Sequence, residues 1–254
     1  MKISIVTISF NQDKYLRQCI DSILSQTDCD LEYIVVDPGS TDNSRQIIES
    51  YGDRIIKVFE PDKGPADGLI KGFKHATGDV FGFINSDDYL LPGALAHVNR
   101  FFETQSLDCF MTGQGFRENE KGTQTRIRPE QLSVRDLLYR ATVVFQQTTF
   151  FPAHLYKKIG GFNPNNATCW DYELFLDLLL HGAKHHITAE DLAVFRLYQG
   201  SISGSGRLTQ QCFKDLDAMF YRAKARTWNN FDDLCSLYLR MWRKLRRLTH
   251  DRMD

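Results

Sequence analysis

The sequence lacks the signatures of several large classes of protein. Its six cysteines include no C-x-x-C pair, which argues against a zinc site and against a disulfide framework in a chain of 254 residues. No window approaches the roughly 18 apolar residues of a membrane span, and the first residues, MKISIVTISFNQ, lack the features of a signal peptide. The formal net charge is −1, so no overall basic surface for nucleic acid is expected. These absences predict a cytoplasmic protein.

Two phosphate-binding motifs are also missing. No G-x-G-x-x-G follows the first predicted strand, and G-x-x-x-x-G-K-[ST] occurs nowhere, which disfavours dinucleotide-dependent dehydrogenases and P-loop nucleotidases. What remains is an ordinary globular composition, with 42% hydrophobic and 25% charged residues. The length allows one large domain or two small ones.

The first hundred residues alternate between two hydrophobic periods. Dense β-branched runs such as ISIVTISF predict buried strands, and apolar residues at helical spacing between them predict helices. This alternation indicates an α/β fold with a mostly parallel central sheet flanked by helices. The predicted strands are 3–10, 31–37, 54–60 and 79–85, and the predicted helices are 13–26, 41–50, 66–76 and one that Pro92 opens and that runs to about 103.

Polar side chains follow three of these strands. Ser9 and Asn11 end the first, Asp37 ends the second, and Asp87 with Asp88 follows the fourth. In parallel sheets, ligands bind beyond the carboxyl ends of the strands. We therefore expect these three groups to meet at one edge of the sheet.

The middle of the chain has a mixed pattern. A hairpin is expected around 119–122, a helix near 133–140, a strand over 142–151, a helix over 168–182 that Gly182 ends, and a further strand within 185–198. The segment GSISGSG (200–206) predicts a loop, which is either a mobile lid or a plain linker.

The C-terminal segment is amphipathic and basic. From residue 239 onward six basic residues oppose two acidic ones, and an apolar stripe runs through LCSLYLRMWRKLRRL (234–248). This pattern favours two alternatives equally. The helix lies on an anionic membrane surface through 234–250, or it packs on the domain or in an oligomer.

Adjacent carboxylates at a strand end have three ordinary uses, which are to hold a divalent metal, to act as an acid–base pair, or to cap the next helix. Mg²⁺ and Mn²⁺ prefer oxygen ligands and are usually held by one or two carboxylates and substrate phosphates. Such an ion would neutralise the charge of a nucleoside diphosphate. Asp37 could accept hydrogen bonds from a base or ribose.

At this point the sequence resembles a known family. The matching stretches cover about residues 2–205 in order, and they resemble the inverting family 2 glycosyltransferases, which have the GT-A fold. They read VTISFNQDKYLRQCIDSILSQ, YIVVDPGSTDNS, EPDKGPADGLIKGFKHATGDVFGFINSDDYLLPGAL, QTTFFPAHLYKKIGGFNP, CWDYELFLDLLLHGAK and FRLYQGSISGSG.

The resemblance implies roles for the nucleotide-binding half. Thr7 and Ser9 would line the base pocket, and Asp37 would bond the base or ribose. Asp67 would lie near the nucleotide, in the stretch that matches K-G-x-x-D-A-x-N-x-G. Gly68, Leu69 and Ile70 depart from that pattern, which puts a polar nucleotide contact in doubt.

The resemblance also implies where the chemistry occurs. Asp88 would be the metal ligand and Asp87 the ribose contact, in the position of the family's D-x-D motif. Asp171, in CWDYE, would be the catalytic base, and Glu173 is the competing candidate, although it points about 200° away around the helix. Arg196 would contact the nucleotide, whereas Tyr198 replaces a frequent histidine.

The implied reaction is a single displacement with inversion, in which Asp171 deprotonates an acceptor hydroxyl. Mn²⁺ or Mg²⁺ would assist departure of a nucleoside diphosphate. The resemblance implies UDP sugars as donors, by family habit. Gln146, Gln147 and Trp170 either line the acceptor site or belong to the core. The acceptor would be a glycan or a lipid-linked saccharide in cell-surface polysaccharide or glycolipid synthesis.

Three segments follow from this interpretation. Residues 1–105 form the nucleotide-sugar part of the GT-A domain, 106–205 the acceptor and catalytic-base part, and 206–254 a C-terminal helical extension. The alternatives are a nucleotidyltransferase that makes the sugar nucleotide, and a catalytically silent sugar-nucleotide-binding protein. A location on the cytoplasmic face of the inner membrane depends on the C-terminal segment alone.

Overall fold

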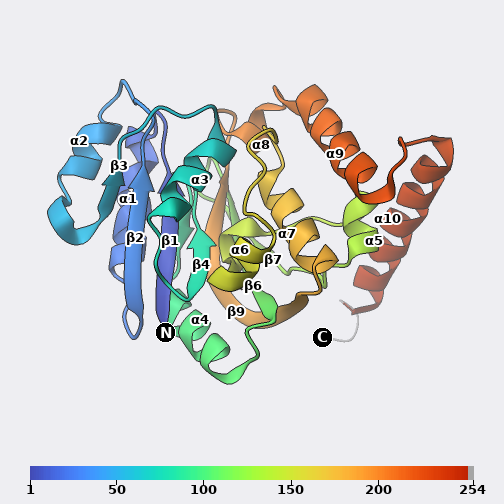
Figure 1. The fold of residues 1–254 in the computed structure, drawn as a ribbon, viewed down its shortest axis with the longest axis horizontal. Coiled ribbons are helices and arrows are strands. Elements are labelled where there is room, and N and C mark those ends of the chain that lie inside the picture. The colour runs from blue at the N-terminus through green and yellow to red at the C-terminus, as the bar shows by residue number, and fades with distance from the viewer. Residues whose placement is uncertain (251–254) are drawn as a thin grey trace.

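The protein forms one mixed β-sheet with helices packed on both faces (Figure 1). The computed structural model describes residues 1–250, and of residues 202, 203 and 246–250 only the backbone is described. Within this range the strands are β1 (Lys2–Ile8), β2 (Asp30–Val36), β3 (Ile56–Val58), β4 (Val80–Phe83), β5 (Tyr89–Leu90), β6 (Cys109–Asn119), β7 (Gln124–Ile127), β8 (Thr149–Pro152) and β9 (Lys184–Leu197).

The helices connect and cover these strands. Within the same range they are α1 (Asp13–Leu24), α2 (Ser44–Glu49), α3 (Pro65–Lys74), α4 (Ala94–Thr104), α5 (Val134–Leu138), α6 (Ala153–Lys158), α7 (Trp170–Leu180), α8 (Ile202–Ser205), α9 (Thr209–Lys224) and α10 (Asn230–His250). Two single turns of 3₁₀ helix, η1 (Gly52–Arg54) and η2 (Gln146–Thr148), complete the elements.

The strand order in the sheet is β3-β2-β1-β4-β8-β6-β9-β5, and β7 pairs with β6. The pairs β1–β2, β2–β3 and β1–β4 are parallel, as the alternation of strands and helices predicts. β8 then runs antiparallel to both β4 and β6, while β6 and β9 are parallel. The predicted α/β class is confirmed, and the second half of the sheet is mixed.

Two hydrophobic cores lie on opposite faces of the sheet, because successive strand side chains alternate between the faces. On one face Val6 and Val36 pack with Leu69 and Phe73 of α3. On the other face Ile5 packs in the core that α1 and α4 cover. Residues 3–7 of β1 are all buried, as a dense β-branched run predicts.

Two predicted elements have different bounds. The strand expected over 142–151 is restricted to β8, and η2 precedes it. In η2 the side-chain amide of Gln146 donates to the carbonyl of Phe83, and that of Gln147 donates to Asp88, so polar bonds replace strand pairing there. Helix α4 begins at Ala94 rather than at Pro92, because Gly93 precedes it with φ of 80°, a left-handed conformation that cannot continue a helix.

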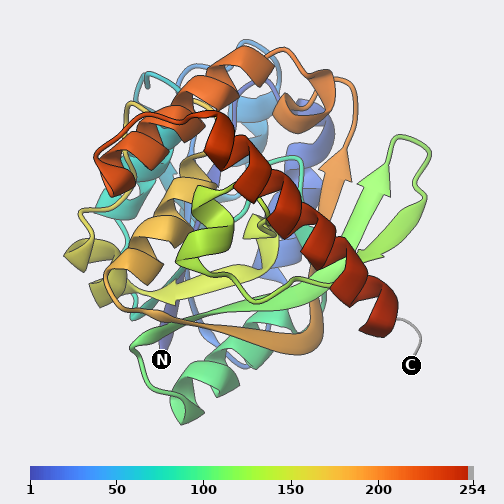
Figure 2. The ribbon, with the colours of Figure 1, turned by 90° about the vertical axis from the view of Figure 1, so that its right-hand side faces the viewer.

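Helices α9 and α10 form a C-terminal extension on the side of the molecule away from β1–β3 (Figure 1). Helix α10 crosses over α5, as Figure 2 shows. The C-terminal helices that the sequence predicts are therefore present, while residues 251–254 of the predicted segment lie outside the described residues. None of the described helices is both long and apolar enough to cross a membrane.

The close approach of α3 to the sheet provides a test of the packing. A Cβ atom at Gly72 would lie 2.4 Å from Cγ1 of Val6 and 3.0 Å from Cγ2 of Val36. We expect Gly72→Ala to lower the free energy of unfolding by about 1–3 kcal/mol through overpacking, measured by urea unfolding. Helix propensity alone predicts the opposite sign, a gain of about 1 kcal/mol.

Lys74→Ala, on the exposed side of the same helix, is the matched control, with an expected change within about 0.5 kcal/mol. A stabilised Gly72→Ala protein would contradict the close packing of α3 on β1 and β2.

Candidate active site

A large cleft opens at the carboxyl ends of β1 and β4 and extends to α5, α7 and α10. Its volume is about 2070 Å³, which exceeds the roughly 300–1,000 Å³ of a pocket for a single small ligand. Ser9, Asn85 and Asp87 line one end, and Trp170 and Asp171 lie on its wall. The cleft has room for two substrates side by side.

Of the strand-end polar groups, Ser9 and Asp87 line the cleft, and Asp37 precedes the lining residue Pro38 without lining the cleft itself. Asp37 is buried, and its Oδ1 accepts hydrogen bonds from the backbone N–H groups of Gly39 (2.9 Å) and Ser40 (2.8 Å). Within the described residues, Oδ2 of Asp37, Oγ of Ser9 and Oδ1 of Asn85 are buried and lack a hydrogen-bond partner. Buried polar atoms are normally satisfied, so the atoms of Ser9 and Asn85, which also line the cleft, mark a place for a polar ligand.

Asp87 and Asp88 have different surroundings. Asp88 is fully buried, its Oδ1 accepts from the backbone N–H of Arg196 (2.8 Å), and its Oδ2 accepts from Nε2 of Gln147 (2.8 Å). Asp87 instead lines the cleft. The sequence predicts that Asp88 binds the metal and that Asp87 contacts the ribose. The contacts favour Asp87 as the carboxylate that a cation reaches.

The charge of this pair fits a divalent cation. Burial raises the pKa of both carboxyl groups, and for Asp88 the neighbouring Asp87 adds to the rise. Among the described residues no group of three or more His, Cys, Asp or Glu side chains could hold a metal alone. This donor set suits an ion such as Mn²⁺ or Mg²⁺ that substrate phosphates also hold.

The side chain of Arg196 binds other groups of the protein and does not line the cleft. Its guanidinium donates to Oε1 of Glu118 (3.0 Å), to the carbonyl of Asp87 (2.9 Å) and to Oε1 of Gln18 (2.6 Å). It also lies between two aromatic rings, those of Tyr15 and Tyr89, 4.9 and 4.6 Å from the ring centres. These contacts favour a structural role for Arg196, and the nucleotide contact that the resemblance implies stays a prediction.

Asp171 stands at the start of α7, where the helix dipole favours a negative charge. Its Oδ1 accepts from the backbone N–H of Tyr172 (2.8 Å), and the residue lines the cleft beside Trp170. Burial raises the pKa of Asp171 to about 6. A carboxylate with such a pKa is suited to take up a proton near neutral pH.

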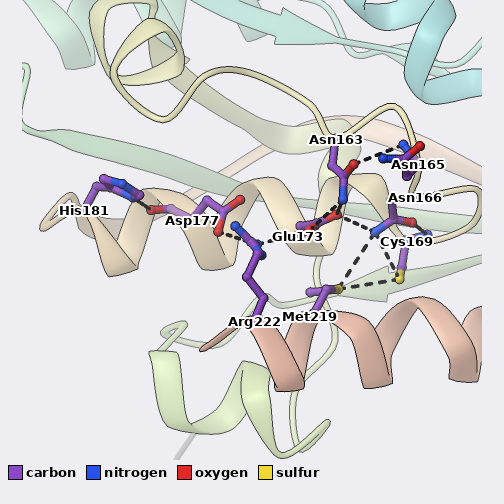
Figure 3. A network of polar contacts seen from close by, with 9 residues as sticks. All are labelled: Asn163, Asn165, Asn166, Cys169, Glu173, Asp177, His181, Met219 and Arg222. Atoms are coloured by element: carbon purple, nitrogen blue, oxygen red, sulfur yellow. Dashed lines mark hydrogen bonds and ion pairs between the residues drawn. The ribbon is translucent and has the colours of Figure 1, made fainter. Parts of the chain in front are cut away.

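Glu173 points towards Asn163, Asn166 and Arg222 (Figure 3), and it is not among the residues that line the cleft. It is buried, accepts from Nδ2 of Asn166 (2.8 Å) and Asn163 (3.2 Å), and pairs with Arg222 of α9 (3.0 Å). This network ties α7 to α9. Glu173 is therefore a poor candidate for the base.

Two further predicted residues lie outside the lining of the cleft. Thr7 is fully buried, and its Oγ1 accepts from the hydroxyl of Tyr33 (3.0 Å). Asp67 accepts from the backbone N–H of Lys63 (3.0 Å) and pairs with Lys71 (3.3 Å), contacts that hold the start of α3. The lining of the cleft contains Ser9, Asp87 and Asp171, whereas Asp37, like Thr7 and Asp67, is not part of it.

Asp62 is a cleft residue that the sequence reasoning missed. It lines the cleft, Gly64 donates its backbone N–H to Oδ1 (2.9 Å), and burial raises the pKa of the carboxyl group. A Cβ at Gly68 would lie 2.8 Å from its Oδ2, so a glycine there leaves room for the carboxylate. Its place after β3 is the signal that could have identified it, since the strand-end rule applies to that strand too.

The other end of the cleft is basic. Arginines from the β6–β7 hairpin, the segment after it, α5 and α10 line this end. Some of them pair with carboxylates, as Arg126 does with Asp191 and Arg243 with Glu130. The cleft residues at this end are Arg117, Arg126, Arg128, Arg135 and Arg243.

Comparison with known proteins supports one family. The model of "Glycosyl transferase family 2" matches residues 4–159. The chain belongs to glycosyl transferase family 2. An uncharacterized glycosyltransferase of Nostoc is 38% identical over 111 residues, which are 42% of this chain and 34% of the relative. The chain thus spans about a third of that relative's length.

Solved structures show the same fold at low sequence identity. The structure of residues 1–349 of TarS from S. aureus in complex with UDP-GlcNAc has a TM-score of 0.72 and 18% identity, and covers 94% of this chain and 70% of that one. Glucosyl-3-phosphoglycerate synthase from Mycobacterium tuberculosis, in complex with Mn²⁺, UDP and phosphoglyceric acid, has a TM-score of 0.64 and 20% identity, over 86% of this chain and 78% of that one. The GT-A fold of this family 2 chain is therefore confirmed.

The contacts of Arg196 can be tested by substitution. We expect Arg196→Met to lower the free energy of unfolding by about 1–3 kcal/mol, because it removes the guanidinium that half-buried Glu118, Gln18 and the carbonyl of Asp87 share. The measurement is urea unfolding in the absence of nucleotide.

Arg117→Met, at an exposed position that lies beside Phe195 in the neighbouring strand, is the control and should stay within about 0.5 kcal/mol. A stable Arg196→Met protein with weakened nucleotide binding would show that Arg196 contacts the ligand instead.

Proposed function

We propose that this family 2 chain transfers a sugar from a nucleoside-diphosphate sugar, best a UDP sugar, to a hydroxyl group of a glycan or lipid-linked saccharide, with inversion. The observation that carries the proposal is the cleft itself. Its lining includes Asp87, Asp171 and the arginines named above, and it includes two buried polar atoms, Oγ of Ser9 and Oδ1 of Asn85, that lack a partner among the described residues. The product would serve cell-surface polysaccharide or glycolipid synthesis.

The donor would occupy the strand-end half of the cleft. Asp37 Oδ2 and Ser9 Oγ offer acceptors to the N–H and O–H groups of a nucleoside, and neither has a partner among the described residues. Asp87 would hold a divalent cation, Mn²⁺ or Mg²⁺, and Asp88 would support it from behind. The cation would supply charge neutralisation for the departing diphosphate. Binding of UDP sugar by TarS and of Mn²⁺ by the M. tuberculosis enzyme supports these roles by analogy.

Asp171 would act as the general base. Its carboxylate takes the proton of the acceptor hydroxyl while that oxygen forms a bond to the anomeric carbon. The bond from this carbon to the diphosphate oxygen breaks on the opposite side, and its electron pair leaves with the nucleoside diphosphate. Attack opposite the leaving group inverts the configuration. Gln146 and Trp170, which line the same cleft, would contact the acceptor.

We also propose that the protein works at the cytoplasmic face of the inner membrane, where lipid-linked acceptors are found. The proposal rests on α10, and the next subsection develops it.

Ligand binding tests the donor half. We expect UDP with Mn²⁺ to raise the melting temperature more than UDP or Mn²⁺ alone, because a ligand that binds only the folded state stabilises it. Asp87→Asn should abolish the extra effect of Mn²⁺ and keep the metal-independent shift, measured by thermal shift with UDP, GDP, ADP and CDP.

Asp88→Asn is the paired variant. It should alter the melting temperature of the free protein, because both of its oxygens accept buried hydrogen bonds, yet keep the response to Mn²⁺. Loss of the Mn²⁺ response in Asp88→Asn alone would restore the assignment made from the sequence. No nucleotide response at all in the unsubstituted protein would overturn the proposed function.

Activity tests the role of Asp171. Since its pKa is about 6, the rate should fall about tenfold per unit of pH below that value, as the base becomes protonated. Asp171→Asn should keep the UDP-induced thermal shift and lose about 10²–10⁴-fold in rate, measured as UDP release from the UDP sugar that stabilises the protein most.

Glu173→Gln on the same helix is the control, and it should retain transfer while the network with Arg222 weakens. Full activity of Asp171→Asn would assign the base to another residue. So would a rate of this variant that still falls below pH 6 as in the unsubstituted protein.

A further inference from the structure

Helix α10 packs on the protein with its polar side. Asp232 and Ser236 are buried, and so is Leu239 on the same side. Asp232 forms two bonds of 2.6 Å with the guanidinium of Arg226. Further along, Arg243 pairs with Glu130 and donates to the carbonyl of Ala141 (3.2 Å). Ionic and polar contacts therefore hold much of α10 in place.

The apolar side of α10 faces outward. Seven large apolar side chains on this side are between 50% and 66% exposed. They extend over about 21 Å of helix at 1.5 Å per residue. We call them the outer face of α10, and they are Phe231, Leu234, Leu237, Tyr238, Met241, Trp242 and Leu245.

An exposed stripe of this size marks a binding surface, since soluble proteins rarely leave large contiguous apolar patches in water. The side chains around the outer face favour a particular partner. Arg240 and Lys244 are exposed beside it. Of the acidic residues of α10 within the described range, Asp232 is neutralised by Arg226, whereas Asp233 is exposed and keeps its charge. Arg240 and Lys244 outnumber it, so the net charge beside the stripe is positive.

This charge argues against a second copy of the chain as the occupant. A twofold contact places the same surface on both sides, so it would bring two surfaces of the same net positive charge together. A bilayer with anionic lipids combines an apolar acyl-chain region with negatively charged headgroups. Basic side chains beside an apolar stripe are the complement of that surface.

We infer that the outer face of α10 lies on an anionic membrane surface, with the helix parallel to the bilayer. Trp242 belongs to the outer face and also lines the cleft, and Leu239 and Arg243 line it too. The basic end of the cleft therefore opens beside the membrane. This last point rests on the proposed function, because it places a lipid-linked acceptor within reach of Asp171 while its lipid stays in the bilayer.

Vesicle binding by the full chain tests the inference, and it needs neither donor nor turnover. We expect the protein to co-sediment with vesicles of phosphatidylcholine and phosphatidylglycerol, and to bind pure phosphatidylcholine vesicles weakly. The emission of Trp242 should shift to the blue on binding and lose this shift in Trp242→Phe. Leu237→Asn/Met241→Asn should lower partitioning about tenfold or more, and Arg240→Gln/Lys244→Gln should lower it on anionic vesicles only.

Leu180→Asn/Tyr221→Asn is the matched control, because it removes two exposed apolar side chains from α7 and α9. It should partition like the unsubstituted protein, and circular dichroism should confirm that all variants are folded. Equal partitioning of the Leu237→Asn/Met241→Asn variant would overturn the inference. So would light scattering that shows a dimer which this variant dissociates, with no binding to vesicles.

Discussion

The buried carboxylate of Asp88 joins the two halves of the sheet, and the site depends on this contact. Asp88 follows β4, Gln147 precedes β8, and Arg196 lies in β9. The carboxylate of Asp88 accepts a hydrogen bond of 2.8 Å from each of these two residues, although they come from distant parts of the chain. Because both oxygens are occupied inside the protein, the next residue back along the chain, Asp87, is presented to the cleft. The guanidinium of Arg196 then binds the carbonyl of Asp87 and fixes the same turn from the other side.

This arrangement leaves the donor end of the cleft with surplus negative charge and unsatisfied acceptors. Burial raises the pKa of Asp62, Asp87 and Asp88 together, which means that the folded protein disfavours their charged forms. Burial of these charged groups destabilises the protein without ligand, and a bound cation or polar ligand would relieve this destabilisation. This electrostatic character is consistent with the proposed binding of a metal and a nucleotide.

Sequence reasoning located the strand ends but could not assign every side chain there. The order of strands and helices predicts that Ser9, Asp37 and Asp87 lie at one edge of the sheet, because parallel strands bring their carboxyl ends there. Ser9 and Asp87 line the cleft, and Asp37 precedes the lining residue Pro38. The order of the elements could not tell which of two adjacent carboxylates faces the cleft, since β4 ends at Phe83 and the alternation of a strand does not extend beyond it. The role of Arg196 depends on distant partners that no local pattern reveals.

The C-terminal helix shows a related limit. Its amphipathic pattern is evident in the sequence, but the pattern does not say which side meets the protein. Burial of an apolar stripe is the usual outcome, and here the specific bonds of Asp232 and Arg243 hold the polar side inward instead. These bonds fix the rotation of α10 about its own axis and so keep the apolar side in water. A helix that only stabilised the domain would bury that side, so the ionic contacts are best explained as the means by which the protein presents it to a partner.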